Sequence, residues 1–291
     1  MVMSARRLLL VDGTQLFYRS FFGIRGLSTH EGQPSNAVFG FIRGIHQLLD
    51  VWNPSHWAVA WDGGSPKTRL DLLPEYKAQR PPMPDDLRRQ VEPVREFLKL
   101  AGIPLIRLEQ QEADDVLASL AHWGERNVDD VIIVTSDKDL YQLVSEKTGM
   151  AAWGKDDKRL GRAEVFEKTG VHPGQIIEWL ALTGDAVDNI SGVEGMGPKT
   201  AAKLLGQFGS LDVMWSRLDE IHSARIRANL ITQRDRVERN LALVRLRIDL
   251  PCCPEWDTLA VKPEWPAVMR PFYARMDFHS LIKASDQGEL F

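Results

Sequence analysis

Acidic residues are concentrated in the stretch QEADDVLA, residues 111–118, which places three carboxylates within four residues. These are Glu112, Asp114 and Asp115, and an apolar run follows them. Like charges at this density repel one another, so folding disfavours them unless a positive charge lies nearby. The neutralising partner could be a protein cation, a helix N-terminus or a metal ion.

Three short apolar runs elsewhere in the chain are each followed by an aspartate. Residues 8–11 lead to Asp12, residues 57–61 to Asp62, and residues 131–134 to Asp137. Uninterrupted apolar runs of this kind are typical of strands buried on both faces of a parallel sheet. In such sheets ligands bind beyond the carboxyl ends of the strands. The three aspartates are therefore predicted to share one site.

A fourth apolar run, residues 104–108, precedes the acidic stretch. As a further strand of the same sheet, it would bring Glu112 and its neighbours to the edge where the aspartates lie. Asp114 or Asp115 alone could instead cap a helix that begins near Val116.

A second acidic group lies downstream. Asp139 follows two residues after Asp137, and the stretch TGDAVDN contributes Asp185 and Asp188. Capping could explain any one of these residues but not the whole set. We call the predicted set the acid cluster, and it comprises Asp12, Asp62, Glu112, Asp114, Asp115, Asp137, Asp139, Asp185 and Asp188. Oxygen ligands without His or Cys suit Mg²⁺ or Mn²⁺ rather than Zn²⁺.

Helix-like stretches separate or follow the apolar runs, at residues 37–49, 87–101, 116–123 and 175–182. Strands that alternate with helices predict an α/β fold with right-handed crossovers. The composition is that of an ordinary globular protein, because 44% of the 291 residues are hydrophobic and 26% are charged.

No apolar run approaches the ~20 residues that a membrane-spanning helix needs. The two cysteines, Cys252 and Cys253, form neither a zinc pattern nor a disulfide framework. A cytoplasmic protein without a membrane partner is expected. The net charge of −4 does not indicate a nucleic-acid partner, but residues 197–247 carry ten lysines and arginines against five acids. That excess of +5 is either a solvated helical surface or a binding surface.

A basic segment, residues 67–80 (KTRLDLLPEYKAQR), has four cations against two acids. It could supply positive charge to a phosphate, or it could be a solvated helix end with its tyrosine packed inward. A second candidate is the glycine loop, residues 192–197, which precedes Pro198 and Lys199. Pro198 separates the last glycine from the lysine, which disfavours a nucleotide-hydrolysing P-loop. The loop could present backbone N–H groups to a phosphate or form a plain turn between helices.

Six stretches resemble, in order and spacing, the 5′-nuclease domain attached to bacterial DNA polymerase I, within the flap endonuclease family. They are LLLVDG, WDGG, the basic segment, QEADDVLA, TSDKDLYQL and TGDAVDNISGVEGMGPKTA, and the resemblance runs from about residue 8 to residue 281. Ser191 stands where the family has proline, and Thr68 stands where it has an aromatic residue. A polymerase-less branch of the family lacks several acids of the second group, whereas here Asp139, Asp185 and Asp188 are present.

The resemblance implies a PIN-like α/β core with a mostly parallel sheet flanked by helices, a helical arch at about residues 65–100, and a helix-hairpin-helix module that binds DNA. The expected domains are residues 1–171 for the nuclease core and 172–291 for the DNA-binding module and C-terminal helices.

The resemblance also implies a role for each site residue. It assigns Asp12, Asp62, Glu112, Asp114 and Asp115 to the first of two Mg²⁺ or Mn²⁺ ions, and Asp137, Asp139, Asp185 and Asp188 to the second. Lys77 and Arg80 are expected at the phosphate, with Tyr76 stacked on a base. DNA contacts are expected from Arg69, Gly195, Gly197, Lys199 and Thr200, and the glycine loop sometimes holds K⁺ in this family.

The expected function is structure-specific hydrolysis of DNA at 5′ flaps and 5′ ends by a monomer, in replication or repair. Two alternatives stay open at this point. One is a DNA-binding scaffold that has lost catalysis, and the other is a PIN-type ribonuclease, although such chains are usually shorter and lack the glycine loop.

Overall fold

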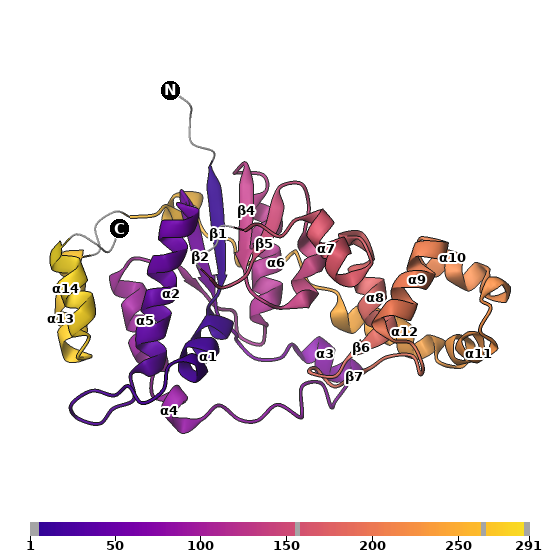
Figure 1. The fold of residues 1–291 in the computed structure, drawn as a ribbon, viewed down its shortest axis with the longest axis horizontal. Coiled ribbons are helices and arrows are strands. Elements are labelled where there is room, and N and C mark those ends of the chain that lie inside the picture. The colour runs from indigo at the N-terminus through magenta and orange to yellow at the C-terminus, as the bar shows by residue number, and fades with distance from the viewer. Residues whose placement is uncertain (1–5, 155–157, 263–265, 288–291) are drawn as a thin grey trace.

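A five-stranded parallel sheet forms the centre of the molecule in the computed structural model, which describes residues 6–154, 158–262 and 266–287 (Figure 1). The strand order is β3-β2-β1-β4-β5, so the first strand lies in the middle. The strands are β1 (Arg7–Asp12), β2 (His56–Ala60), β3 (Leu105–Ile106), β4 (Asp130–Val134) and β5 (Thr148–Ala151). The four apolar runs therefore form strands as predicted, and β5 is an additional strand.

Both faces of the sheet are buried, which explains why its strands are apolar without alternation. Leu8 and Leu10 of β1 pack into one core cluster, and Leu9 and Val11 pack into another on the opposite face. The helices of the Leu9 side are α1 (Gly13–Gly23), α2 (Asn36–Trp52), α5 (Val91–Leu100), α13 (Pro266–Arg275) and α14 (His279–Gln287). The Leu8 side is covered by α6 (Ala113–Gly124), α7 (Arg162–Thr169) and α8 (Ile176–Thr183).

A helical lobe extends from the sheet at the end of the molecule opposite α13 and α14 (Figure 1). Its helices are α9 (Pro198–Phe208), α10 (Leu211–Ser216), α11 (Ala224–Thr232) and α12 (Arg234–Val244). A short hairpin of β6 (Gly184–Asp185) and β7 (Ile190–Ser191) lies beside it. Asn240 is fully buried and donates to the carbonyls of Ala181 and Ser191, so it fixes α12 to α8 and to the hairpin.

The described residues also contain short 3₁₀ segments. They are the 3₁₀ helices η1 (Lys138–Leu143), η2 (Pro173–Gln175), η3 (Leu218–Glu220) and η4 (Trp256–Leu259). None of the helices in the described residues is long and apolar enough to cross a membrane.

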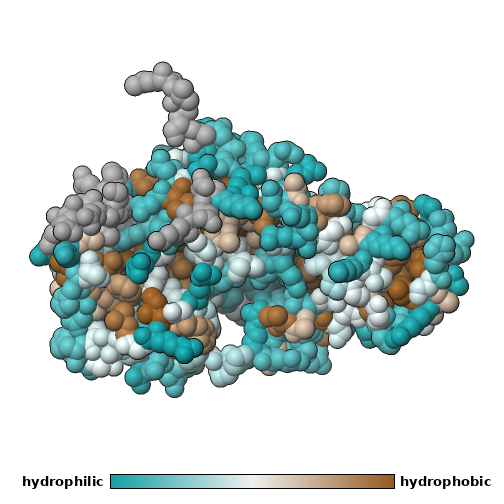
Figure 2. Space-filling model, viewed as in Figure 1, coloured by the Kyte–Doolittle hydropathy of each residue, from teal (hydrophilic) through white to brown (hydrophobic). Residues whose placement is uncertain are grey.

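The segment expected to form the arch contains two short helices, α3 (Lys67–Leu72) and α4 (Asp85–Arg88). The chain between them runs along the lower side of the molecule, and the space-filling view shows an opening between it and the rest of the protein (Figures 1 and 2). The predicted helix at residues 87–101 is divided, since α4 ends at Arg88 and α5 begins at Val91. Gln90 lies at this break and accepts hydrogen bonds from the backbone N–H groups of Ala37 and Val38 in the first turn of α2.

Candidate active site

The aspartates that follow β1, β2 and β4 lie at one edge of the sheet. Asp12 ends β1 and pairs with Ala60, two residues before Asp62. On the other side, Val11 pairs with Val134, three residues before Asp137. Since these strands are parallel, their carboxyl ends meet at the same edge.

Asp12 is buried and accepts two hydrogen bonds. Its carboxylate caps α1 by accepting from the backbone N–H of Gln15 at 2.9 Å, and it accepts from the Thr135 hydroxyl at 3.0 Å. Burial raises the pKa of Asp12 to about 6, the two hydrogen bonds oppose this shift, and the charges of Asp137 and Asp62 add to it. The raised pKa of Asp12 therefore reflects mainly the cost of burying a carboxylate, with a smaller contribution from the neighbouring acids.

The QEADDVLA acids lie at the start of α6. This helix begins at Ala113, three residues earlier than predicted, so Asp114 and Asp115 lie in its first turn and neither is the N-cap. The N-cap is Glu112, whose side chain makes no capping bond. Burial raises the pKa of Asp114 well above its ordinary value, with further contributions from Asp137 and Asp12. Simple capping therefore does not explain these acids.

Asp137 and Asp139 lie at the start of η1. Asp137 accepts from the backbone N–H of Asp139 at 2.9 Å. The Oδ1 atom of Asp139 is buried and makes no hydrogen bond in the described part of the chain. Burial raises the pKa of Asp139 to about 8, and the neighbouring charges of Asp137, Asp185 and Asp188 contribute. An unsatisfied buried oxygen of this kind is a candidate ligand for a cation.

Protein cations neutralise part of the cluster. Lys77 Nζ lies 2.6 Å from Glu112 Oε1 and 3.6 Å from Asp188 Oδ2, and Arg80 Nη2 lies 2.6 Å from Asp188 Oδ1. Burial acts to lower the pKa of Lys77, but the charges of Glu112 and Asp188 outweigh it and raise that pKa. The two cations predicted at the phosphate therefore do lie against the acids.

Lys138 is a further cation at the cluster, and the sequence reasoning missed it. Its Nζ lies 3.1 Å from Asp185 Oδ2, although the side chain remains 42% exposed. The position of Lys138 between Asp137 and Asp139 in the sequence was the available signal.

Two predicted DNA contacts lie in the interior instead. Arg69 is buried and forms ion pairs with Glu112 and Asp115. Tyr76 is also buried, and its hydroxyl lies 3.0 Å from Glu112 Oε2 and 3.2 Å from Asp188 Oδ2. Stacking of Tyr76 on a base does not fit this placement, and neither does a direct DNA contact by Arg69. The inward-packed tyrosine, weighed as an alternative from the sequence, describes the structure better.

The donor set fits a hard cation, although no group of three His, Cys, Asp or Glu side chains in the described residues is arranged to hold one ion. Glu112 and Asp188 are occupied by protein cations in this arrangement. A cavity of about 10 Å³ lies among the acids and is lined in part by Glu112, Asp114, Asp139 and Asp188. Buried carboxylates with raised pKa values and the unsatisfied Asp139 oxygen favour a positive ion there.

The glycine loop leads directly into α9. Gly195 adopts a left-handed φ of 76°, Gly197 is the N-cap of α9, and Pro198 occupies its first turn. Lys199 is exposed on that first turn and Thr200 is half-buried. Arg225 of α11 holds the loop through an ion pair with Glu194 at 3.0 Å. The loop therefore presents a helix N-terminus with an exposed lysine to the surface.

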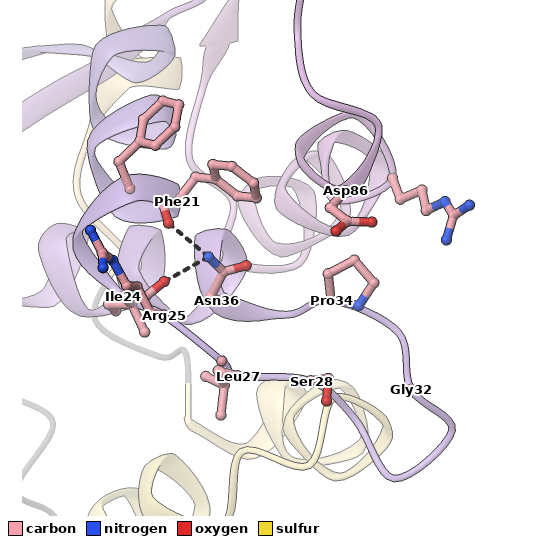
Figure 3. Close-up of a pocket in the computed structure, with 12 residues that line it drawn as sticks. Phe21, Ile24, Arg25, Leu27, Ser28, Gly32, Pro34, Asn36 and Asp86 are labelled. Carbon is pink, nitrogen blue, oxygen red and sulfur yellow. Dashed lines mark hydrogen bonds between the residues drawn. The ribbon is translucent and has the colours of Figure 1, made fainter.

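A larger cavity, of about 550 Å³, lies away from the acid cluster (Figure 3). It is bounded by the end of α1, the loop to α2 and Asp86 of α4. Asn36 donates to the carbonyls of Phe21 and Ile24 and so ties α2 to the end of α1 (Figure 3). None of the nine acids lines this cavity, so the chemistry lies elsewhere.

Two family models cover most of the chain. Residues 7–170 match the N-terminal, resolvase-like domain of 5′-3′ exonucleases, and residues 171–266 match the C-terminal SAM-fold domain of the same enzymes.

Curated relatives agree with these matches. A 5′-3′ exonuclease of Aquifex aeolicus is 36% identical over 97% of this chain and 96% of its own length. Thermostable DNA polymerase I of Thermus thermophilus is 37% identical over 95% of this chain, but the match covers 33% of that polymerase. The chain thus spans about a third of the polymerase relative.

Among solved structures, the bacteriophage T5 D15 flap endonuclease, in a pseudo-enzyme-product complex with DNA and metal ions, has a TM-score of 0.71. It is 22% identical to this chain, over 97% of this chain and all of that one. This likeness confirms the fold predicted from the resemblance. Both domain models match, and the Aquifex relative is matched over 96% of its length, so the chain belongs to the 5′-3′ exonuclease family.

Proposed function

We propose that the protein is a structure-specific 5′-nuclease, which hydrolyses DNA phosphodiesters at 5′ flaps and 5′ ends in replication or repair. The observation that carries this proposal is the acid cluster at one sheet edge, with Lys77 and Arg80 against it. The Aquifex 5′-3′ exonuclease, matched along 96% of its length, supports the reaction class. The T5 D15 complex, which contains DNA and metal ions, supports the substrate and the ion requirement.

The acid cluster would hold two divalent ions, Mg²⁺ or Mn²⁺. Asp12, Asp62, Glu112 and Asp114 would surround the first, and Asp137, Asp139, Asp185 and Asp188 the second. When bound, such ions activate a water as the nucleophile and neutralise charge on the departing 3′ oxygen. The raised pKa values of Asp12 and Asp139 are consistent with a site that requires added positive charge.

The chain's own cations act on the phosphate. Lys77 and Arg80 lie at the acid edge, so a phosphodiester placed there comes within reach of both. Negative charge builds up on the phosphoryl oxygens as water attacks, and charged donors aimed at that position stabilise the transition state by several kcal/mol. Glu112 and Asp188 hold the two donors in place before the substrate arrives.

The helical lobe would bind the duplex. Residues 1–171 would form the nuclease core, and residues 172–291 would supply the DNA-binding module and the C-terminal helices, of which α13 and α14 pack against the Leu9 face of the sheet. Backbone N–H groups of the glycine loop, with Lys199 and Thr200, would contact phosphates, and K⁺ would bind the loop carbonyls. Phosphate contacts carry no base code, so recognition depends on the shape of the DNA. The enzyme would act as a monomer in the cytoplasm.

A cleavage assay tests the proposal. A 5′-labelled DNA flap, a matched RNA flap and a blunt duplex are incubated over a Mg²⁺ titration, and the products are mapped. We expect Mg²⁺-dependent cleavage near the flap junction, with 5′-phosphate and 3′-hydroxyl products and a strong preference for DNA. Binding without cleavage at any Mg²⁺ concentration would favour a non-catalytic scaffold, and preferred cleavage of the RNA flap would favour a ribonuclease.

A further inference from the structure

Arg69 is a buried cation shared by two acids of the cluster. It lies in the first turn of α3 with 5% of its surface exposed. Its Nη1 donates to Asp115 Oδ2 at 2.6 Å and its Nη2 donates to Asp115 Oδ1 at 2.9 Å. Nη1 also donates to Glu112. This two-pronged pairing with Asp115 is the geometry that fits a guanidinium and not an ammonium.

The other side of the same guanidinium binds the end of α12. Its Nε donates to the carbonyl of Leu243 at 3.0 Å, and its Nη2 donates to that of Arg245 at 3.3 Å. Since α12 ends at Val244, Leu243 is one of the last residues, whose carbonyls have no partner within the helix. A cation at this end also interacts favourably with the helix dipole. Arg69 therefore connects the helical lobe to the acid cluster.

Asp115 differs from its neighbour Asp114 in its surroundings. It is fully buried, and both of its oxygens accept hydrogen bonds from Arg69. Its Oδ1 also accepts from the backbone N–H of Arg247 at 2.9 Å, just beyond α12. These three bonds take up most of the roughly four lone-pair sites of the carboxylate and hold it toward Arg69 and the end of α12. The charge of Asp115 is therefore already neutralised within the protein.

We propose that Arg69 is a positioning residue that sets the place of Glu112 from the end of α12, and that Asp115 is its counter-ion and not a metal ligand. This inference rests on the proposed function in one respect, which is the role of Glu112 as a ligand of the first ion. It replaces the expectation that Arg69 contacts DNA and Asp115 binds the first ion. Movement of α12 on DNA binding would reach Glu112 through the Arg69 side chain.

The salt dependence of DNA binding separates a positioning role from a DNA contact. Affinity for a flap substrate is measured in EDTA at several salt concentrations for Arg69→Gln and for Lys199→Ala. Loss of one phosphate contact reduces the slope of log affinity against log salt by about 0.9. We expect that reduction for Lys199→Ala and an unchanged slope for Arg69→Gln. A reduction of that size for Arg69→Gln would overturn the proposal.

The same Arg69→Gln protein should show a split between turnover and substrate binding. With Glu112 released, we expect kcat to fall roughly tenfold or more, the range seen when a residue that orients a metal ligand is lost, while KM for the flap stays within error. A higher KM with kcat unchanged would instead mark Arg69 as a substrate contact. Arg162→Gln, which removes an exposed ion pair with Glu146, is the matched control.

Calorimetric titration of Mg²⁺ without DNA tests Asp115 separately and does not depend on cleavage. We expect Asp115→Asn to bind the same number of ions as the wild type, with affinity reduced less than tenfold. Asp114→Asn removes a ligand, so this variant should bind one ion fewer or bind Mg²⁺ more than roughly tenfold more weakly. Equal losses in both variants would show that Asp115 is a ligand. A failed cleavage assay combined with this calorimetric pattern would count against the proposed function alone.

Thermal unfolding tests the pairing itself. Arg69→Met leaves the Asp115 charge buried and unpaired, which is strongly destabilising. Adding Asp115→Asn removes that charge while its amide oxygen still accepts from Arg247. We therefore expect the double variant to unfold at a higher temperature than Arg69→Met alone. A double variant that is less stable than either single variant would contradict the pairing.

Discussion

Lys77 Nζ lies 2.6 Å from Glu112 Oε1, so a lysine of the basic segment is joined to the acid that precedes α6. Only 11% of the lysine side chain and 3% of the glutamate side chain are exposed. A solvated surface lysine would not be buried in this way, because desolvation of a charge is costly unless it is paired. The buried ion pair is therefore part of the site, and it favours a functional role for the basic segment over a solvated helix end.

Replacing Lys77 with methionine should reduce cleavage strongly. Lys77→Met removes the charge and keeps a long unbranched side chain that is one atom shorter. Loss of one charged donor at a reacting phosphate typically costs roughly 100- to 1,000-fold in rate. We expect a loss of that size in the single-turnover rate at saturating Mg²⁺. Lys99→Met, on the exposed side of α5, is the control, and a wild-type rate in Lys77→Met would return Lys77 to a structural role.

Asp139→Ala should separate catalysis from binding. Its unsatisfied buried oxygen makes Asp139 a candidate ligand of the second ion. Because a catalytic ion contributes several kcal/mol to the transition state, we expect cleavage to fall roughly 100-fold or more. Affinity for the flap in EDTA should stay near that of the wild type. Unchanged turnover would contradict the assignment of two ions.

The sequence was sufficient to place the strand-end acids. Asp12, Asp62 and Asp137 each follow an apolar run that can be recognised as a strand from its own residues. A parallel sheet then necessarily brings the carboxyl ends of these strands to one edge. β5 was not predicted, because Thr148-Gly-Met-Ala151 is short and contains a glycine, which weakens a strand.

The burial of Arg69 could not be read from the sequence. Residues 67–69 look like an exposed basic helix start, and what buries Arg69 is contact with groups far along the chain. Its partner Asp115 is 46 residues away, and the carbonyl of Leu243 is 174 residues away. Contacts between residues this far apart in the sequence decide whether a cation faces DNA or an acid. The residues next to Arg69 in the sequence carry no information about those contacts.

The stability of the protein without divalent ions should decline as the pH rises. The pKa of Asp139 increases on folding from 3.8 to about 8, and burial is the main cause. Between these pH values the folded protein holds a proton that the unfolded chain has released. The stabilisation from this proton is therefore complete below pH 3.8 and is lost as the pH rises through 8. The pKa of Asp12, raised to about 6, acts in the same direction at lower pH.

Chemical denaturation in EDTA at pH 5, 7 and 8.5 measures this decline. In Asp139→Asn the titrating group is absent, so the free energy of unfolding should fall less steeply with pH. The variant should then be more stable than the wild type at pH 8.5. Saturating Mg²⁺ should flatten the wild-type profile, because a bound cation replaces the proton. Identical pH profiles in the two proteins would show that Asp139 titrates normally.

Gly63 should tolerate no side chain. A Cβ atom at this position would lie 1.7 Å from the carbonyl oxygen of Leu108 and 3.0 Å from that of Gln111. Gly63→Ala must therefore displace either Asp62 or the loop that leads to Glu112. Overpacking of this kind costs about 1–3 kcal/mol or more. We expect a lower free energy of unfolding and a loss of Mg²⁺ affinity, whereas Gly174→Ala, where a Cβ meets nothing within 4 Å, should change neither.

Lys199→Ala should weaken DNA binding without changing its sequence preference. Lys199 is exposed in the first turn of α9, directly after the glycine loop. Loss of one phosphate contact should reduce the slope of log affinity against log salt by about 0.9, equally for flaps of different sequence. Lys99→Ala, exposed on α5, is the control for a general loss of positive charge, because α5 and α9 lie at opposite ends of the molecule (Figure 1). Equal slopes for Lys199→Ala and the wild type would mean that the duplex does not contact this helix, and the glycine loop would then be a plain turn.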